Sequence, residues 1–227
     1  MNARLWPIVT IVGGLATFGV FVAFGMLPEV QTAYAAGAAP GAVSQFQRAE
    51  TMADLVQVLG GDPPNPAIAA AHTALNTLDL KVFIAAYTIF LIGSALMIGG
   101  PRAPLTWAAI AAAVAGAGGD FVETSKQLAV TADWANAEAQ LPIATWHWIK
   151  YFSLGASGFA IAALCVLGER RRWILAVLAL APLVCMVLVY AGVIASPRVF
   201  QGAITLYWLA LLALAVKEAV RAKDAPA

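Results

Sequence analysis

Residues 103–126 read APLTWAAIAAAVAGAGGDFVETSK, an apolar run that ends in two acids and a lysine. The run carries no charge until Asp120, and Glu123 and Lys126 then follow within seven residues. A helix needs about 20 largely apolar residues to cross about 30 Å of hydrocarbon. The stretch therefore predicts a membrane helix over residues 105–124 with polar groups near its far end.

The composition of the whole chain agrees with a membrane protein. Of its 227 residues, 62% are apolar and 11% are charged, whereas an average soluble domain carries about 25% charged residues. A chain with so few polar residues could not cover its core in water, so we expect lipid around it. The net charge of +1 gives no reason to expect a nucleic-acid partner.

Only helices or closed barrels pair every backbone group inside a bilayer. The chain lacks the alternating segments of about ten residues that a barrel needs, so the predicted fold class is an all-α, polytopic integral membrane protein. It forms one six-helix transmembrane domain over residues 1–227, with membrane lipids as its first partners. The six spanning helices are expected over residues 6–27, 80–99, 105–124, 149–167, 173–194 and 200–216.

The distribution of basic residues predicts the orientation, because lysine and arginine favour the cytoplasmic side. With the N-terminus inside, the inside segments hold eight of the thirteen basic residues, and the loop GERRRW is the strongest signal. Both termini are then cytoplasmic, and the expected location is a bacterial cytoplasmic membrane. Alternatively, the first helix is a signal peptide cleaved after AYA, which leaves five helices. Its apolar run exceeds the roughly 7–15 residues of a signal core, which favours an uncleaved helix.

One long outer loop, residues 28–79, is expected to contain a surface helix over residues 43–59. Its residues Met52, Leu55, Val56 and Leu59 follow the i, i+3, i+4, i+7 spacing of one apolar helical face. The pair Ser44 and Gln47 has the spacing of a capping box, and the stretch GGDPPNP ends the helix. We expect this helix to lie on the outer surface or against the bundle.

Counting along the helices predicts one buried ion pair. From the inner end of its helix, Asp120 lies roughly 22 Å into the membrane and Glu123 roughly 27 Å, and Lys150 lies roughly 27 Å from the same side. Lys150 can therefore meet Glu123 directly, and Asp120 by reaching inward. A short connection joins the two helices, so they are expected to be neighbours. An acid inside a membrane is costly unless it has a partner, and Lys150 is the partner expected for Asp120.

The outer polar groups are the candidates for chemistry. Asp120 and Glu123 are the candidate acid and base, and Lys150 or His147 would hold an anionic head group. The candidate binding residues are His72, Asn76, Asp79, Lys126 and Tyr151. The alternative is that these charges only reach the membrane interface from helix ends and have no chemical role.

Metal binding is the weaker interpretation of these polar residues. His72 and His147 with Asp120 and Glu123 offer zinc-type ligands, but the chain has only two histidines, on separate helices, and no HExxH motif. We predict no metal site and assign no cofactor.

Three classes of function remain, and the sequence leaves open whether the protein is an enzyme. The first is a membrane protein with a polar cavity at its outer face that binds or processes a lipid-like or anionic small molecule. The second is an accessory or assembly subunit of a larger membrane complex, without its own chemistry and with other membrane subunits as partners. The third is a transporter or channel, which is less favoured because the polar groups occupy one layer and no helix is clearly broken at mid-membrane.

Overall fold

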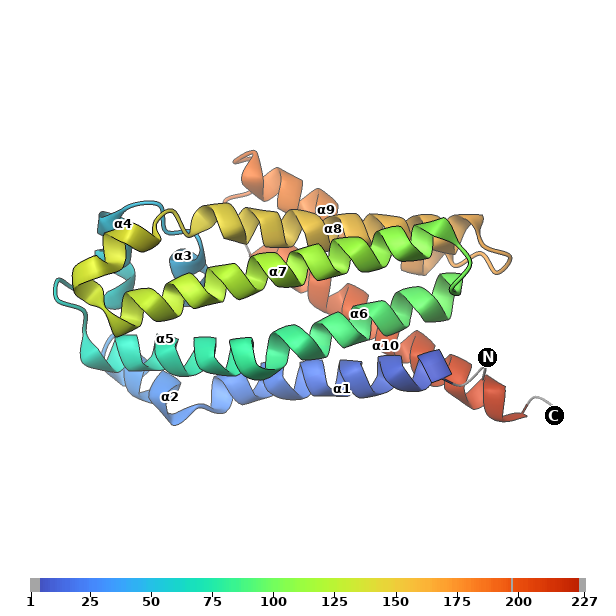
Figure 1. Ribbon diagram of the computed structural model, residues 1–227, viewed down its shortest axis with the longest axis horizontal. Coiled ribbons are helices and arrows are strands. Elements are labelled where there is room, and N and C mark those ends of the chain that lie inside the picture. The colour runs from blue at the N-terminus through green and yellow to red at the C-terminus, as the bar shows by residue number, and fades with distance from the viewer. Residues whose placement is uncertain (1–4, 197, 225–227) are drawn as a thin grey trace. The chain divides into compact units, whose positions relative to one another are not determined.

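The structure, a computed structural model, describes residues 5–196 and 198–224, and its residues 1–4, 197 and 225–227 are not described. The described part is helical and contains no strand (Figure 1). Its elements are α1 (Leu5–Met26), α2 (Pro28–Ala35), α3 (Ala42–Gln47), α4 (Met52–Leu59), α5 (Pro66–Leu78), the π-helical turn η1 (Asp79–Phe83), α6 (Ile84–Gly99), α7 (Pro104–Ala132), the 3-10 segment η2 (Trp134–Gln140), α8 (Ala144–Leu167), α9 (Trp173–Tyr190) and α10 (Arg198–Asp224).

Six helical stretches are long and apolar enough to cross a membrane, which confirms the predicted all-α fold and number of spans. These stretches are Leu5–Ala35, Pro66–Gly99, Pro104–Ala132, Ala144–Leu167, Trp173–Tyr190 and Arg198–Arg221.

Five of the six spans extend beyond their predicted ranges, and the fifth ends at Tyr190 instead of residue 194. The second and third spans illustrate the extensions. The second begins at Pro66 instead of residue 80, because the Asn65 side chain caps it by accepting hydrogen bonds from the backbone N–H groups of Ala67 and Ile68, at 3.0 and 3.4 Å. The third ends at Ala132 instead of residue 124. Both extensions carry polar residues, so a count of apolar residues underestimates the helix length.

The chain forms two compact units. Of the residues that the structure describes, those within 1–17, 86–116 and 151–227 form unit 1, and those within 18–85 and 117–150 form unit 2. Each unit has its own packing.

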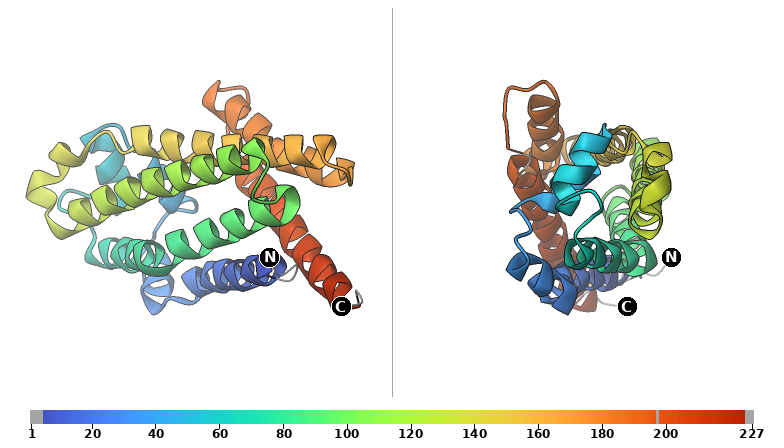
Figure 2. Two further views of the ribbon diagram at one scale, coloured as in Figure 1. Left: turned by 45° about the vertical axis from the view of Figure 1, so that its right-hand side comes forward. Right: turned by 90° about the vertical axis from the view of Figure 1, so that its left-hand side faces the viewer.

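Close helix contacts at glycine organise unit 1. A Cβ atom added at Gly13 of α1 would lie 2.7 Å from the backbone nitrogen of Phe90 in α6. Similarly, a Cβ atom at Gly158 of α8 would lie 2.5 Å from the carbonyl oxygen of Ala179 in α9. No larger residue fits at these distances, so these small residues serve packing, as expected for membrane helices. Within the same unit, α9 packs against α10 (Figure 2).

Unit 2 has a separate apolar core, and it includes the outer loop. In place of the single surface helix expected over residues 43–59, the structure has two short helices, α3 and α4. The break occurs where the carbonyl of Ala49 accepts hydrogen bonds from the backbone N–H groups of Ile143 and Ala144, at 2.9 and 3.3 Å. These bonds tie the chain between the two helices to the start of α8, so it cannot continue the helical pattern.

The predicted apolar face of this segment is buried mainly through α4. Leu55 and Leu59 are fully buried in the core of unit 2, with Met52 packed against them and Val58 as an additional buried residue. Val56, which we expected on this face, is only partly buried. Within the same unit, α2 packs along α5 (Figure 1).

The capping box lies at the start of α4 and not at Ser44 and Gln47. The Thr51 hydroxyl accepts from the backbone N–H of Asp54, and the Asp54 carboxylate accepts from the Thr51 backbone N–H at 2.8 Å. The backbone N–H of Glu50 also donates to this carboxylate, and these hydrogen bonds hold the pKa of Asp54 below its usual value. The box gives α4 a defined start independent of α3.

Candidate functional site

A buried lysine shared by two carboxylates is the centre of the polar cluster in unit 2. The Nζ atom of Lys150, on α8, lies 2.9 Å from Oδ1 of Asp120 and 2.8 Å from Oε2 of Glu123, both on α7. All three side chains are at most 5% exposed. The predicted contact between Asp120 and Lys150 is therefore confirmed, and Glu123 is a second partner of the same ammonium group.

The α7 and α8 backbones approach closely beside this lysine. A Cβ atom added at Gly119 would lie 3.0 Å from the backbone nitrogen of Lys150 and 3.2 Å from its Cα atom. The glycine directly precedes Asp120, so the close approach of the backbones and the ion pair are coupled. A larger residue here would require the α8 backbone at Lys150 to move by a few tenths of an ångström.

We expect Gly119→Ala to destabilise the protein by about 1–3 kcal/mol through overpacking. The matched control is Gly118→Ala, because an added Cβ atom at Gly118 meets nothing within 4 Å. Thermal unfolding in detergent measures both variants. Equal melting temperatures for the two variants would show that the close approach is not needed.

A second group of polar side chains surrounds Glu123. The Gln127 amide, one turn along α7, donates to its Oε1 atom at 3.3 Å. Nδ1 of His147, on α8, lies 3.8 Å from the same oxygen, which is longer than a hydrogen bond but close enough for a charge interaction. Both side chains are buried. Glu123 is therefore held by an ammonium and an amide, with an imidazole beside it.

The third carboxyl group, Asp79, comes from the second span. It begins the π-helical turn η1, an irregularity that often occurs at functional sites. Its Oδ2 atom accepts a hydrogen bond from the Thr124 hydroxyl of α7 at 2.8 Å. The carboxyl group is also close enough to Asp120, Glu123 and Lys150 for electrostatic interaction. Thr124 and Asp79 thus connect the second and third spans at the cluster.

The sequence did not point to Thr124, because a hydroxyl in a helix usually bonds to the carbonyl four residues earlier. The sequence feature that could have indicated a role for Thr124 is its position next to Glu123 and one turn after Asp120.

The remaining predicted residues lie in different surroundings. The ring of His72 packs edge-on against Phe46, with centroids 4.9 Å apart, in the apolar core of unit 2. The Lys126 ammonium donates to the backbone carbonyl of Gln140 at 2.7 Å and so holds the end of η2. Tyr151 belongs to unit 1, where its ring contacts Phe200.

Asn76 has one unusual feature. Its side chain is buried on α5, one turn before Asp79, and its Nδ2 donor has no hydrogen-bond partner in the described part of the chain. An unpaired buried donor is costly, so this position favours a hydrogen-bond acceptor that the protein itself does not supply.

The described residues contain no group of three or more His, Cys, Asp or Glu side chains arranged to hold a metal ion. The metal interpretation needed His72 together with His147, Asp120 and Glu123. The ring contact of His72 with Phe46 places it in apolar packing instead.

The charge of the cluster decides what it can do chemically. With all groups ionised and a neutral imidazole, the carboxylates of Asp79, Asp120 and Glu123 against the ammonium of Lys150 leave two uncompensated negative charges. Two uncompensated negative charges have an unfavourable electrostatic free energy in a medium of low dielectric constant. The cluster therefore favours bound protons, a cation or hydrogen-bond donors, and it can exchange protons with a molecule that reaches it.

Comparisons of the chain with protein-family models, with curated proteins and with solved structures found no match.

Proposed function

We propose that this chain is a multi-pass membrane protein that binds a lipid-like small molecule at the polar cluster of unit 2 and acts on it by acid–base chemistry. The observation that carries the proposal is the single lysine shared by Asp120 and Glu123 beside a third carboxyl group and an imidazole. Ionisable groups inside membrane helices are rare, and they mark substrate and proton pathways.

Glu123 is the proposed proton-exchanging group. Lys150 and Gln127 hold its two oxygens in place, so its orientation needs no reorganisation when a proton moves. His147 is the proposed second proton carrier. Its 3.8 Å separation from Glu123 can shorten to a hydrogen bond when a ligand binds, since such contacts are often long in unliganded sites.

The surroundings of Lys150 favour a particular class of ligand. Its ammonium already contacts two carboxylates, and the cluster has an excess of acids, so an anionic head group would meet repulsion there. A hydroxyl or amino group fits better, because either can donate to the carboxylates, and a hydroxyl can also accept from the Nδ2 donor of Asn76. The proposed ligand is therefore a lipid-like molecule that carries a hydroxyl or amine.

A second candidate function is an accessory subunit without chemistry. It is favoured by the burial of Asp120, Glu123, His147 and Lys150, because a buried ionic network can serve only to align helices. The two candidates differ in whether the Glu123 carboxylate is needed for anything beyond packing.

The variant Glu123→Gln separates these candidates, because it preserves the side-chain shape and leaves Lys150 paired with Asp120. The matched control is Glu138→Gln, an exposed acid on η2. Each purified protein is incubated with a total lipid extract of the expression host, and the lipids are compared by mass spectrometry before and after.

We expect the wild type and the control to convert at least one lipid species, and Glu123→Gln to slow this conversion about 10²–10⁴-fold, the range for loss of a general base. Lipid profiles that none of the three proteins changes, with a lower melting temperature for Glu123→Gln than for the wild type and the control, would favour the accessory function.

The proposed location is a bacterial cytoplasmic membrane with both termini in the cytoplasm, based on the arginines between α8 and α9. In a variant lacking Cys165 and Cys185, single cysteines replace Gln57 and Glu169. We expect a membrane-impermeant maleimide to label the position of Gln57 in intact cells, but not that of Glu169. The opposite labelling pattern would invert the topology.

A further inference from the structure

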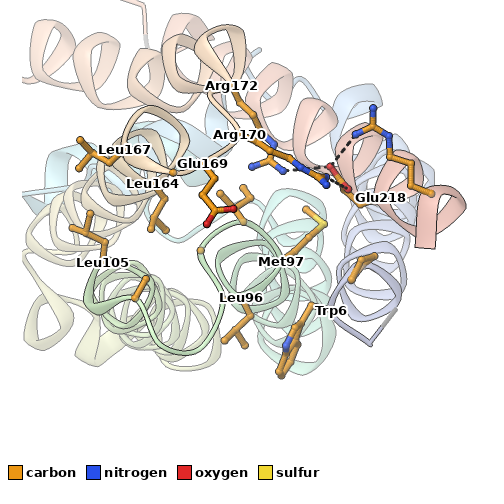
Figure 3. A pocket seen from close by; sticks show the side chains of 17 residues that line it. Trp6, Leu96, Met97, Leu105, Leu164, Leu167, Glu169, Arg170, Arg172 and Glu218 are labelled. Atoms are coloured by element: carbon orange, nitrogen blue, oxygen red, sulfur yellow. Dashed lines mark hydrogen bonds and ion pairs between the residues drawn. The ribbon is translucent and has the colours of Figure 1, made fainter. Parts of the chain in front are cut away.

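Unit 1 contains a large cavity beside the arginine-rich loop that joins α8 to α9. Its volume is 1220 Å³, above the roughly 300–1,000 Å³ of a typical small-molecule site. One side is hydrocarbon, formed in part by Leu105, Leu164 and Leu167, and the other side carries arginines and Glu218 (Figure 3). A cavity with one apolar and one charged side matches the two parts of an amphiphile.

The charged side is built around a single carboxylate. The carboxylate oxygens of Glu218, on α10, lie 3.4 Å from Nη1 of Arg170, 3.3 Å from Nη2 of Arg172 and 3.7 Å from Nη1 of Arg221. One carboxylate cannot neutralise three guanidinium groups, and Glu169, which also lines the cavity, still leaves the lining with a net charge of +1. The lining therefore attracts anions.

The arginines also keep donors available for a ligand. The side chains of Arg170 and Arg221 are 69% and 56% exposed, and each guanidinium has five N–H donors. This fork-shaped arrangement binds phosphate oxygens in pairs. In addition, the lining residue Trp6 has a buried Nε1 donor without a hydrogen-bond partner among the described residues.

We infer that this cavity binds an anionic phospholipid, with its phosphate at Arg170 and Arg221 and its acyl chains along the leucine side. Basic pockets between membrane helices are suited to acidic lipid head groups. The inference goes beyond the proposed function, because it concerns different residues in unit 1 and assigns them no chemistry.

Native mass spectrometry of the full-length protein in mild detergent tests the assignment with dioleoyl phosphatidylglycerol and dioleoyl phosphatidylcholine. The double variant Arg170→Gln, Arg221→Gln removes two cavity charges. The matched control, Arg102→Gln with Arg171→Gln, removes two exposed charges from the loops of the same unit that do not line the cavity. We expect phosphatidylglycerol to bind the wild type and the control about tenfold more tightly than the cavity variant, with phosphatidylcholine binding weakly to all.

Equal binding of phosphatidylglycerol to the cavity variant and to the control would overturn the assignment, as would equal binding of the two lipids to the wild type. Glycerol phosphate and inorganic phosphate serve as head-group probes without acyl chains. If either raises the melting temperature as much as phosphatidylglycerol does, the site binds free anions and the lipid assignment is wrong. Should the cavity variant fail to fold, a salt titration of the wild type replaces it. High salt should weaken phosphatidylglycerol binding, and insensitivity to salt would contradict the proposal.

Discussion

Lys150→Met is expected to destabilise the protein by about 3–5 kcal/mol, the cost of removing one partner from a buried ion pair. The substitution keeps the length and apolar stem of the side chain, but it leaves Asp120 and Glu123 without the ammonium that contacts both. Unfolding in detergent measures the loss. Lys81→Met is the control, because Lys81 is exposed and should have little effect.

Removing the acids as well should recover much of this stability. In a double-mutant cycle, Lys150→Met with Asp120→Asn should be more stable than the sum of the single losses predicts. The triple variant that adds Glu123→Gln should recover more of the stability. Neither of the two carboxylates that contacted the Lys150 ammonium is then present. Strictly additive effects in both steps would show that the contacts contribute no coupling energy.

Leu55→Asp is expected to lower the free energy of unfolding by about 4 kcal/mol or more. Leu55 is fully buried in the core of unit 2, so the substitution removes a leucine from an apolar site, which alone costs about 2–5 kcal/mol for truncation. It also introduces a carboxyl group without a partner. Limited proteolysis should then cut the segment of α3 and α4 rapidly.

The control for this variant is Gln57→Asp, two residues further along α4. Gln57 is exposed, so a carboxylate there stays in solvent and the segment should remain protected. Equal cleavage rates for the two variants would contradict the burial of the α4 face.

The number and type of spans could be predicted from the sequence, because crossing a membrane is a local property of about 20 consecutive residues. The contact of Asp120 with Lys150 could also be predicted, because the rise per residue of a helix converts sequence position into depth. Both inferences need only the periodicity of single helices and the short connection between α7 and α8.

Other features depended on contacts between segments distant in the chain. The break between α3 and α4 occurs where Ala49 accepts hydrogen bonds from the start of α8. Asp79 was a predicted binding residue, but its hydrogen bond is to the Thr124 hydroxyl 45 residues away. Neither contact leaves a local pattern in the sequence, so neither was predicted.

The arginine cluster shows the same difference between local and tertiary information. The sequence by itself determined that Arg170 and Arg172 lie at a helix end, as a charged loop between two apolar runs must. Only the tertiary structure decided that Glu218, 46 residues after Arg172, gathers them at a cavity. Hydropathy is set by neighbouring residues along the chain, whereas a binding site is set by which helix faces meet. The spans could therefore be predicted from the sequence, whereas the cavity could not.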